Sequence, residues 1–80
     1  MKSYEEIEAM LAAHVAHRTG TPADEIDRAR RFDHLGLDSA DTITLTGELE
    51  DFVGHPLSAY LPYAYPTIER LARHVANGDS

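Results

Sequence analysis

The chain has 80 residues, no cysteine and a formal net charge of −7. A chain of this length forms one small domain with little room for a deep enzymatic cleft. The absence of cysteine excludes disulfides, cysteine metal sites and a protein thiol. No stretch is long and apolar enough to span a membrane, and the acidic N-terminus lacks the apolar run of a signal peptide. We therefore expect a cytoplasmic monomer with no membrane partner.

The excess negative charge lies in one segment. Residues 32–69 contain seven acidic residues and no lysine or arginine, and the other seven acids balance the seven bases. A nucleic-acid backbone would be repelled by this segment, so nucleic-acid binding is not expected. A basic protein surface would be attracted. A generally solubilising surface is the alternative explanation.

The first predicted helix runs from about Tyr4 to Arg18. Ser3 and Glu6 have the spacing of a capping box, and Gly20 has the position of a C-terminal cap. The apolar residues recur at helical spacing and define one stripe: Ile7, Met10, Leu11 and Val15.

A long connection, Thr21–Asp38, follows this helix. It contains apolar residues that we expect to pin it to the core: Ile26, Phe32, Leu35 and Leu37. A short helical turn could form over residues 23–29. Connections of this length in compact domains are usually functional or ordered by their own contacts.

The second predicted helix opens at Asp38-Ser39 and ends at Gly54. Its apolar positions are Ile43, Leu45, Leu49, Phe52 and Val53. Amphipathicity alone places Ile43 in the core, although it could instead offer an exposed apolar contact or line an opening for a ligand. Gly47 in the interior costs about 1 kcal/mol relative to alanine.

The C-terminal third is divided by prolines. Pro56 starts a short turn-like segment that reaches about Tyr60, and Pro62 and Pro66 break the chain on either side of residues 63–65. Pro66 suits the first position of a last helix, which Asn77-Gly78 ends. The chain is therefore predicted to be all-α: a small antiparallel bundle of three main helices plus one short helix, with a long loop between the first two.

The chemistry is concentrated where the loop meets the second helix. Ser39 is predicted at the exposed start of that helix, after a glycine turn, so its hydroxyl is presented to a visiting enzyme. Asp38 is a plausible N-cap, with Asp41 three residues further on. The unpaired N–H groups and partial positive charge of a helix N-terminus favour a phosphate on Ser39, although the two aspartates partly oppose it.

The run Leu35-Gly36-Leu37-Asp38-Ser39 resembles the phosphopantetheine-attachment motif of acyl carrier proteins residue for residue. The resemblance continues at the family's spacing through Ile43, Leu45, Leu49 and Glu50, and again through residues 65–72, so it covers nearly the whole chain. The C-terminal part of the match, residues 65–72, is similar to polyketide-synthase carriers. Residues 47–50 and 56–58 are similar to carriers that work with fatty-acid-activating ligases. The resemblance implies a single acyl carrier domain over residues 1–80, and Met1 with short flanks favours a free-standing protein.

The resemblance implies a covalent 4′-phosphopantetheine on Ser39 that holds acyl groups as thioesters, with Asp38 helping to engage the phosphopantetheinyl transferase and its magnesium. It implies a carrier without catalytic activity of its own, in polyketide or fatty-acid-type biosynthesis. The implied partners are that transferase, an acyl-loading enzyme (an acyltransferase or acyl ligase), and a ketosynthase or other acyl-processing enzyme.

We expect the second helix to be the docking face for basic partner enzymes, through Asp41, Ile43, Glu48 and Ala40. Ala40 departs from the family, in which the position after the serine usually has a larger apolar residue that partners touch. The set of partners could therefore be narrower or shifted.

Three alternatives stay open. The chain could be a peptidyl carrier of nonribosomal peptide synthesis, with the same arm and an aminoacyl cargo. It could be a helical interaction module in which Ser39 is only a cap. A small hydrolase is the most distant alternative, because Ser39 lacks the glycine-flanked nucleophile elbow and 80 residues hardly provide an oxyanion hole.

The histidines do not form a metal motif. His14 and His17 are three residues apart and could share a helix face, but no third ligand follows from the spacing. We therefore expect surface histidines and no metal site.

Overall fold

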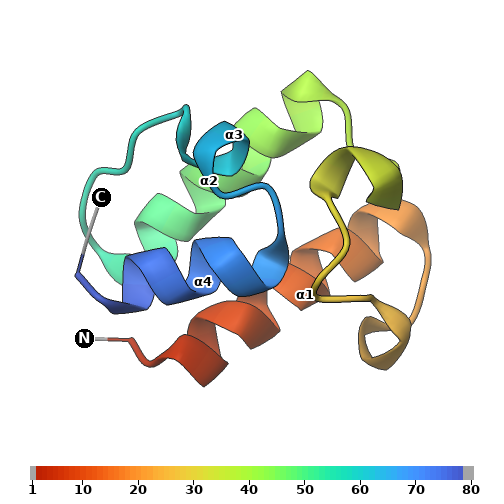
Figure 1. Ribbon diagram of the computed structural model, residues 1–80, viewed down its shortest axis with the longest axis horizontal. Coiled ribbons are helices and arrows are strands. Elements are labelled where there is room, and N and C mark those ends of the chain that lie inside the picture. Colours follow the sequence, from red (N-terminus) through yellow and green to blue (C-terminus); the bar gives the residue numbers. More distant parts are fainter. Residues whose placement is uncertain (1, 79–80) are drawn as a thin grey trace.

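The computed structural model describes residues 2–78, and Figure 1 shows the helices that these residues form. The elements in chain order are α1 (Tyr4–Thr19), the 3₁₀ turns η1 (Ala23–Glu25) and η2 (Phe32–Leu35), α2 (Ser39–Val53), α3 (Leu61–Ala64) and α4 (Ile68–Ala76). No strand forms within the described range, where the only β-type pairing is a single bridge between Arg31 and Thr67. The prediction of three main helices plus a short one, with a long loop between the first two, is confirmed.

Helix α1 is delimited by its caps, as predicted. The Glu6 N–H donates to the Ser3 hydroxyl oxygen at 3.2 Å, and the Ser3 N–H donates to the Glu6 carboxylate at 2.9 Å. At the other end Gly20 adopts a φ of 74°, which favours glycine because a side chain there would be strained.

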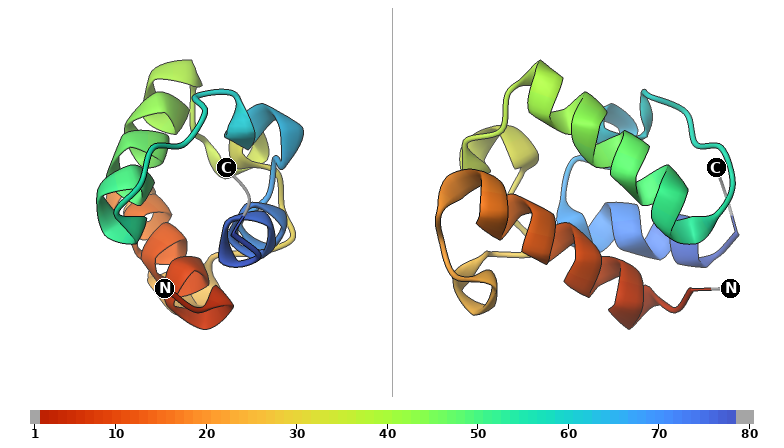
Figure 2. Two further views of the ribbon diagram at one scale, coloured as in Figure 1. Left: turned by 90° about the vertical axis from the view of Figure 1, so that its left-hand side faces the viewer. Right: turned by 180° about the vertical axis from the view of Figure 1, so that it is seen from behind.

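The core lies between the three long helices. Helices α1 and α4 lie side by side and run in opposite directions, and α2 lies across from both (Figures 1 and 2). Burial of each large aliphatic side chain stabilises the fold by about 1.5–3 kcal/mol. The most deeply buried large side chains are Ile7, Leu11, Val15, Leu45, Leu49, Ile68 and Leu71.

The long connection is packed onto this core. Ile26, Phe32 and Leu37 are buried, as predicted. Backbone hydrogen bonds also tie it to the start of α4: the Phe32 N–H donates to the Pro66 carbonyl at 2.9 Å, and the Glu69 N–H donates to the Arg28 carbonyl at 3.0 Å. The segment that leads into α2 is therefore held by a distant part of the chain.

Two predicted helix boundaries are wrong. The short helix lies at residues 61–64, beyond the predicted residues 56–60, and includes Pro62; a first-turn proline is tolerated because its missing N–H would have no helical partner. The last helix begins at Ile68 and not at Pro66, because the Thr67 hydroxyl caps it by accepting from the Arg70 N–H at 3.1 Å. No helix within residues 2–78 is long and apolar enough to cross a membrane.

We expect Gly47→Ala to stabilise the fold by about 0.5–1 kcal/mol, which raises the melting temperature by about 2–8 °C. A Cβ at this helical position would meet no atom within 4 Å, so the gain in helix propensity has no steric cost. Thermal unfolding followed by circular dichroism measures the change. Gly54→Ala is the matched control: its φ of 82° strains any side chain, so it should lower the melting temperature. An unchanged or lower value for Gly47→Ala would contradict the prediction.

Candidate functional site

Ser39 is the first residue of α2 and is exposed to solvent. The chain reaches it from η2 through Gly36, whose φ is 94°, and then through the buried side chain of Leu37. The Leu37 N–H donates to the Phe32 carbonyl at 3.2 Å, which closes the turn. The result is a serine whose backbone is anchored on the core side and whose side chain faces solvent.

The start of α2 is held by a reciprocal pair of side-chain caps. The Asp41 N–H donates to the Asp38 carboxylate at 2.8 Å, and the Asp38 N–H donates to the Asp41 carboxylate at 3.1 Å. The prediction of Asp38 as the N-cap is therefore confirmed. These bonds satisfy two N–H groups that a helix start otherwise leaves unpaired, and they fix the orientation of the turn that contains Ser39.

Asp41 also connects α2 to α1. Its carboxylate forms an ion pair with Arg18, and its side chain is only 12% exposed. The hydrogen bond from the Asp38 backbone N–H and, after it, the Arg18 guanidinium hold the pKa of the Asp41 carboxyl below its ordinary value.

Thr42 lies beneath Ser39 and is buried. Its hydroxyl donates to the carbonyls of Asp38 and Ser39, at 3.0 and 2.9 Å respectively. Sequence reasoning missed this residue. The available signal was a hydroxyl residue one helical turn after the cap, a spacing that allows it to bond back to the preceding turn.

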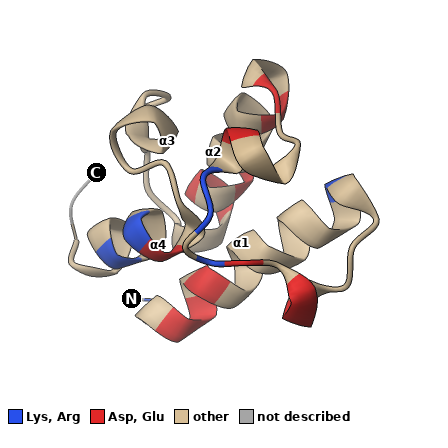
Figure 3. Cartoon of the chain, turned by 45° about the vertical axis from the view of Figure 1, so that its right-hand side comes forward, with Lys and Arg blue, Asp and Glu red and all other residues tan. Residues whose placement is uncertain are grey.

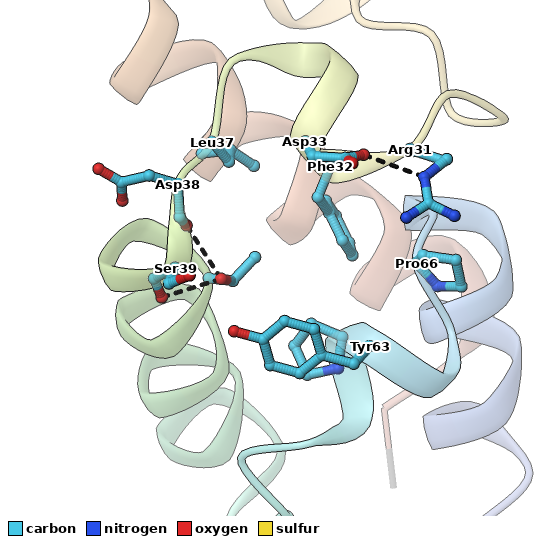
Figure 4. Close-up of a pocket in the computed structure, with 10 residues that line it drawn as sticks. Arg31, Phe32, Asp33, Leu37, Asp38, Ser39, Tyr63 and Pro66 are labelled. Carbon is cyan, nitrogen blue, oxygen red and sulfur yellow. Dashed lines mark hydrogen bonds and ion pairs between the residues drawn. The ribbon is translucent and has the colours of Figure 1, made fainter.

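A hollow of about 330 Å³ lies beside Ser39. Figure 4 shows Asp38 and Ser39 on one side, Arg31 and Phe32 on the other, and Tyr63 of α3 beside them. The ten residues that line it come from α2, from the connection and η2, and from α3 and the residues after it: Arg31, Phe32, Asp33, Leu37, Asp38, Ser39, Thr42, Pro62, Tyr63 and Pro66.

The geometry at Ser39 fits a covalently attached, phosphate-linked group. The Ser39 hydroxyl makes no hydrogen bond with any other residue in the part of the chain that the structure describes, and it is exposed at a helix start, where a phosphate is favoured. The adjoining hollow has apolar walls from Phe32, Leu37 and Pro62, against which an organic chain could lie.

The residues that we predicted as partner contacts lie along α2 but do not all face the same way. Ala40 is exposed. Ile43 is 57% exposed, so the placement of this residue in the core by amphipathicity is wrong; buried Thr42 and Thr46 occupy the inward positions instead. Asp41 and Glu48 lie at the edge that faces α1, where Glu48 contacts His14. Figure 3 shows that α2 has acidic residues and no basic ones.

The prediction of surface histidines is wrong for His14. Its side chain is 11% exposed and packs between α1 and α2, because a histidine on the α1 face that meets α2 can reach the Glu48 carboxylate. His17 is exposed. Within residues 2–78 no group of three or more histidines and acidic residues is arranged to hold a metal ion.

Comparison with known proteins identifies the class of this domain. Residues 10–75 match the family described as "Phosphopantetheine attachment site". The chain belongs to this family, the carrier proteins, in which 4′-phosphopantetheine is attached covalently. The TM-score is 0.89 with an acyl carrier protein from Anabaena sp. PCC 7120, at 32% identity over 98% of this chain and 89% of that one. It is 0.87 with a free-standing peptidyl carrier protein from Acinetobacter baumannii, at 29% identity over 98% of both chains.

Several curated relatives are polyketide synthases. The chain is 37% identical to a phenolphthiocerol/phthiocerol polyketide synthase of Mycobacterium tuberculosis over 89% of its own length, and 33% identical to the polyketide synthase PksM of Bacillus subtilis over 95% of its own length. The match covers 4% and 2% of those proteins. The chain therefore matches one short segment of each of these proteins.

We expect Asp41→Asn to lower the melting temperature at pH 7 and to lose this effect in acid. Because the pKa of Asp41 is lowered in the folded state, its charge stabilises the fold above the unfolded-state pKa of about 3.9, and this contribution is lost as the pH falls through the folded-state pKa. Melting curves of wild type and variant from pH 7 down to about pH 3 should therefore converge. Asp24→Asn, at an exposed carboxyl with no partner within residues 2–78, is the control. A difference that persists unchanged in acid would contradict the prediction.

Proposed function

We propose that the chain is an acyl carrier protein whose 4′-phosphopantetheine is attached to Ser39. The observation that supports this most directly is the free, exposed Ser39 hydroxyl at the doubly capped start of α2. This serine ends the Leu35–Ser39 motif and lies within the residues that match the family. The exposed Asp38 carboxylate beside it is proposed to engage the transferase that installs the arm.

The attached group supplies a terminal thiol, which the cysteine-free chain lacks, for holding an acyl group as a thioester. The residues of the chain itself position that group. The caps and Thr42 fix the turn that contains Ser39, and the Leu37 side chain anchors the turn to the core. The carrier performs no catalysis of its own in this proposal; tethering raises the concentration of the cargo at each partner's active site.

The proposed docking face is the side of α2 next to Ser39: Ala40, Ile43 and Glu48 are exposed there, and Asp41, which pairs with Arg18, lies at its edge. Basic enzyme surfaces would be steered toward this negatively charged helix, and Ile43 offers an apolar contact. The polyketide-synthase relatives support an acyl-loading enzyme and a ketosynthase as partners.

A peptidyl carrier is the second candidate. The similarity over 98% of the Acinetobacter baumannii peptidyl carrier protein supports it, because the same helical scaffold occurs there. The curated relatives favour the acyl assignment, because those named above are polyketide synthases.

The attachment is tested by incubating the apo chain with coenzyme A, magnesium and a broad-specificity phosphopantetheinyl transferase. We expect the intact mass to rise by one phosphopantetheinyl group for wild type and to stay unchanged for Ser39→Ala. Ser58→Ala is the matched control at another exposed serine, and it should be modified like wild type. No gain with several transferases on a folded chain would leave Ser39 as a helix cap and favour an interaction module.

The class of cargo is tested on the modified chain. We expect an acyltransferase with malonyl-coenzyme A, or an acyl ligase with a fatty acid and ATP, to add an acyl group that hydroxylamine removes. Aminoacyl loading by an adenylation enzyme should be slower by at least about tenfold, which corresponds to about 1.4 kcal/mol of discrimination. Faster aminoacyl than acyl loading would favour the peptidyl carrier.

A further inference from the structure

Most of the acidic residues on α2 are engaged within the fold. Asp38 and Asp41 cap the helix reciprocally, and Asp41 also pairs with Arg18. Glu50 accepts a hydrogen bond from the Leu57 N–H at 2.9 Å, and Glu48 contacts His14. Asp51 is exposed and has no partner within residues 2–78. The directions of these carboxylates, except that of Asp51, are therefore set by contacts within the fold.

His14 has the most constrained of these contacts. It projects from α1 into the seam with α2, and its Nδ1 faces the Glu48 carboxylate. Its Nε2 is fully buried and has no hydrogen-bond partner in the described part of the chain. Glu48 itself is 54% exposed, so the contact occupies one side of the carboxylate and leaves the other open to solvent.

The surroundings of the ring select one neutral tautomer. A neutral imidazole has an N–H on one nitrogen and a lone pair on the other. An N–H on Nδ1 donates to the carboxylate in a charge-assisted hydrogen bond, and only a lone pair is then left unpaired in the interior. The opposite tautomer would bury an unpaired donor and would place a lone pair against the carboxylate, which is repulsive.

We infer that His14, as its Nδ1–H tautomer, is a positioning residue for the docking face, because it holds the Glu48 carboxylate in one direction for a basic group of a partner enzyme. Arg18 pairs with Asp41 near the start of α2, but that carboxylate is only 12% exposed and its other oxygen caps the helix, so Glu48 is the one left open to a partner. A glutamate that is already ordered loses less side-chain entropy when a partner binds, so association is favoured. The inference rests on the proposed function, in which α2 is the face that partners contact.

A double-mutant cycle tests the coupling. The KM and kcat of a phosphopantetheinyl transferase are measured for wild type, His14→Leu, Glu48→Gln and the double variant. We expect His14→Leu to raise KM about two- to fivefold with kcat unchanged, and to have no further effect when Glu48 is already Gln. His14→Gln, which keeps an N–H donor, should restore part of the loss. His17→Leu, at the exposed histidine on the same helix, should leave KM unchanged.

A spectroscopic measurement on the unaltered chain keeps the inference testable if His14→Leu does not fold. In ¹⁵N spectra recorded at an alkaline pH where the ring is neutral, the proton of His14 should be on Nδ1. An Nε2–H tautomer would overturn the inference, as would independent, additive effects of His14→Leu and Glu48→Gln on KM. If neither the wild type nor any variant accepts phosphopantetheine, the result counts against the proposed function. The ring spectrum of the wild type would still decide the tautomer.

Discussion

The arrangement of this domain depends on the reciprocal hydrogen bonds between Asp38 and Asp41. They end the long connection and begin α2 at one defined residue, so that the next side chain, Ser39, emerges at the surface. A helix start that frayed by one residue would release Ser39 from its helical backbone conformation, so its hydroxyl would no longer point in one defined direction. Two further residues hold this turn in place. The Thr42 hydroxyl donates to the Asp38 carbonyl, and the buried Leu37 side chain anchors the residues just before the helix to the core.

Helix α1 does more than contribute to the bundle core. Its inward face supplies Leu11 and Val15 to that core, and its edge supplies Arg18 and His14 to the acids of α2. The two contacts are about one helical turn apart on α1 (His14 to Arg18) and about two turns apart on α2 (Asp41 to Glu48). Helix α1 therefore determines both the position of α2 and the directions of two of its carboxylates.

Much of the architecture could be predicted because it is encoded locally. The caps at Ser3 and Asp38 and the glycine ends at Gly20 and Gly54 are short patterns with one physical meaning, and the structure has all of them. The five-residue motif located Ser39 in the same way. These features can be predicted without knowing which residues pack against them from the other helices.

The errors occur where distant residues decide the outcome. Ile43 fits an apolar stripe by spacing, but Thr42 and Thr46 satisfy their hydroxyls within the helix and so can face inward at little cost. The burial of His14 depends on Glu48, which is 34 residues away in sequence. The hydrophobic periodicity of one helix does not indicate which helix packs against it, or which side chains that second helix supplies as partners.

The bridge between Arg31 and Thr67, with the hydrogen bond from the Phe32 N–H to the Pro66 carbonyl beside it, ties the Ser39 region to a segment more than 25 residues further along the chain. The geometry at the serine is thus a tertiary property that the surrounding motif does not encode alone. A synthetic peptide of residues 32–45 would have the same sequence around Ser39 but would lack the contacts with Pro66 and Thr67. A helix of that length is also only marginally stable in water by itself. Any enzyme that recognises the shape of this site, and not its sequence, would distinguish the folded domain from such a fragment.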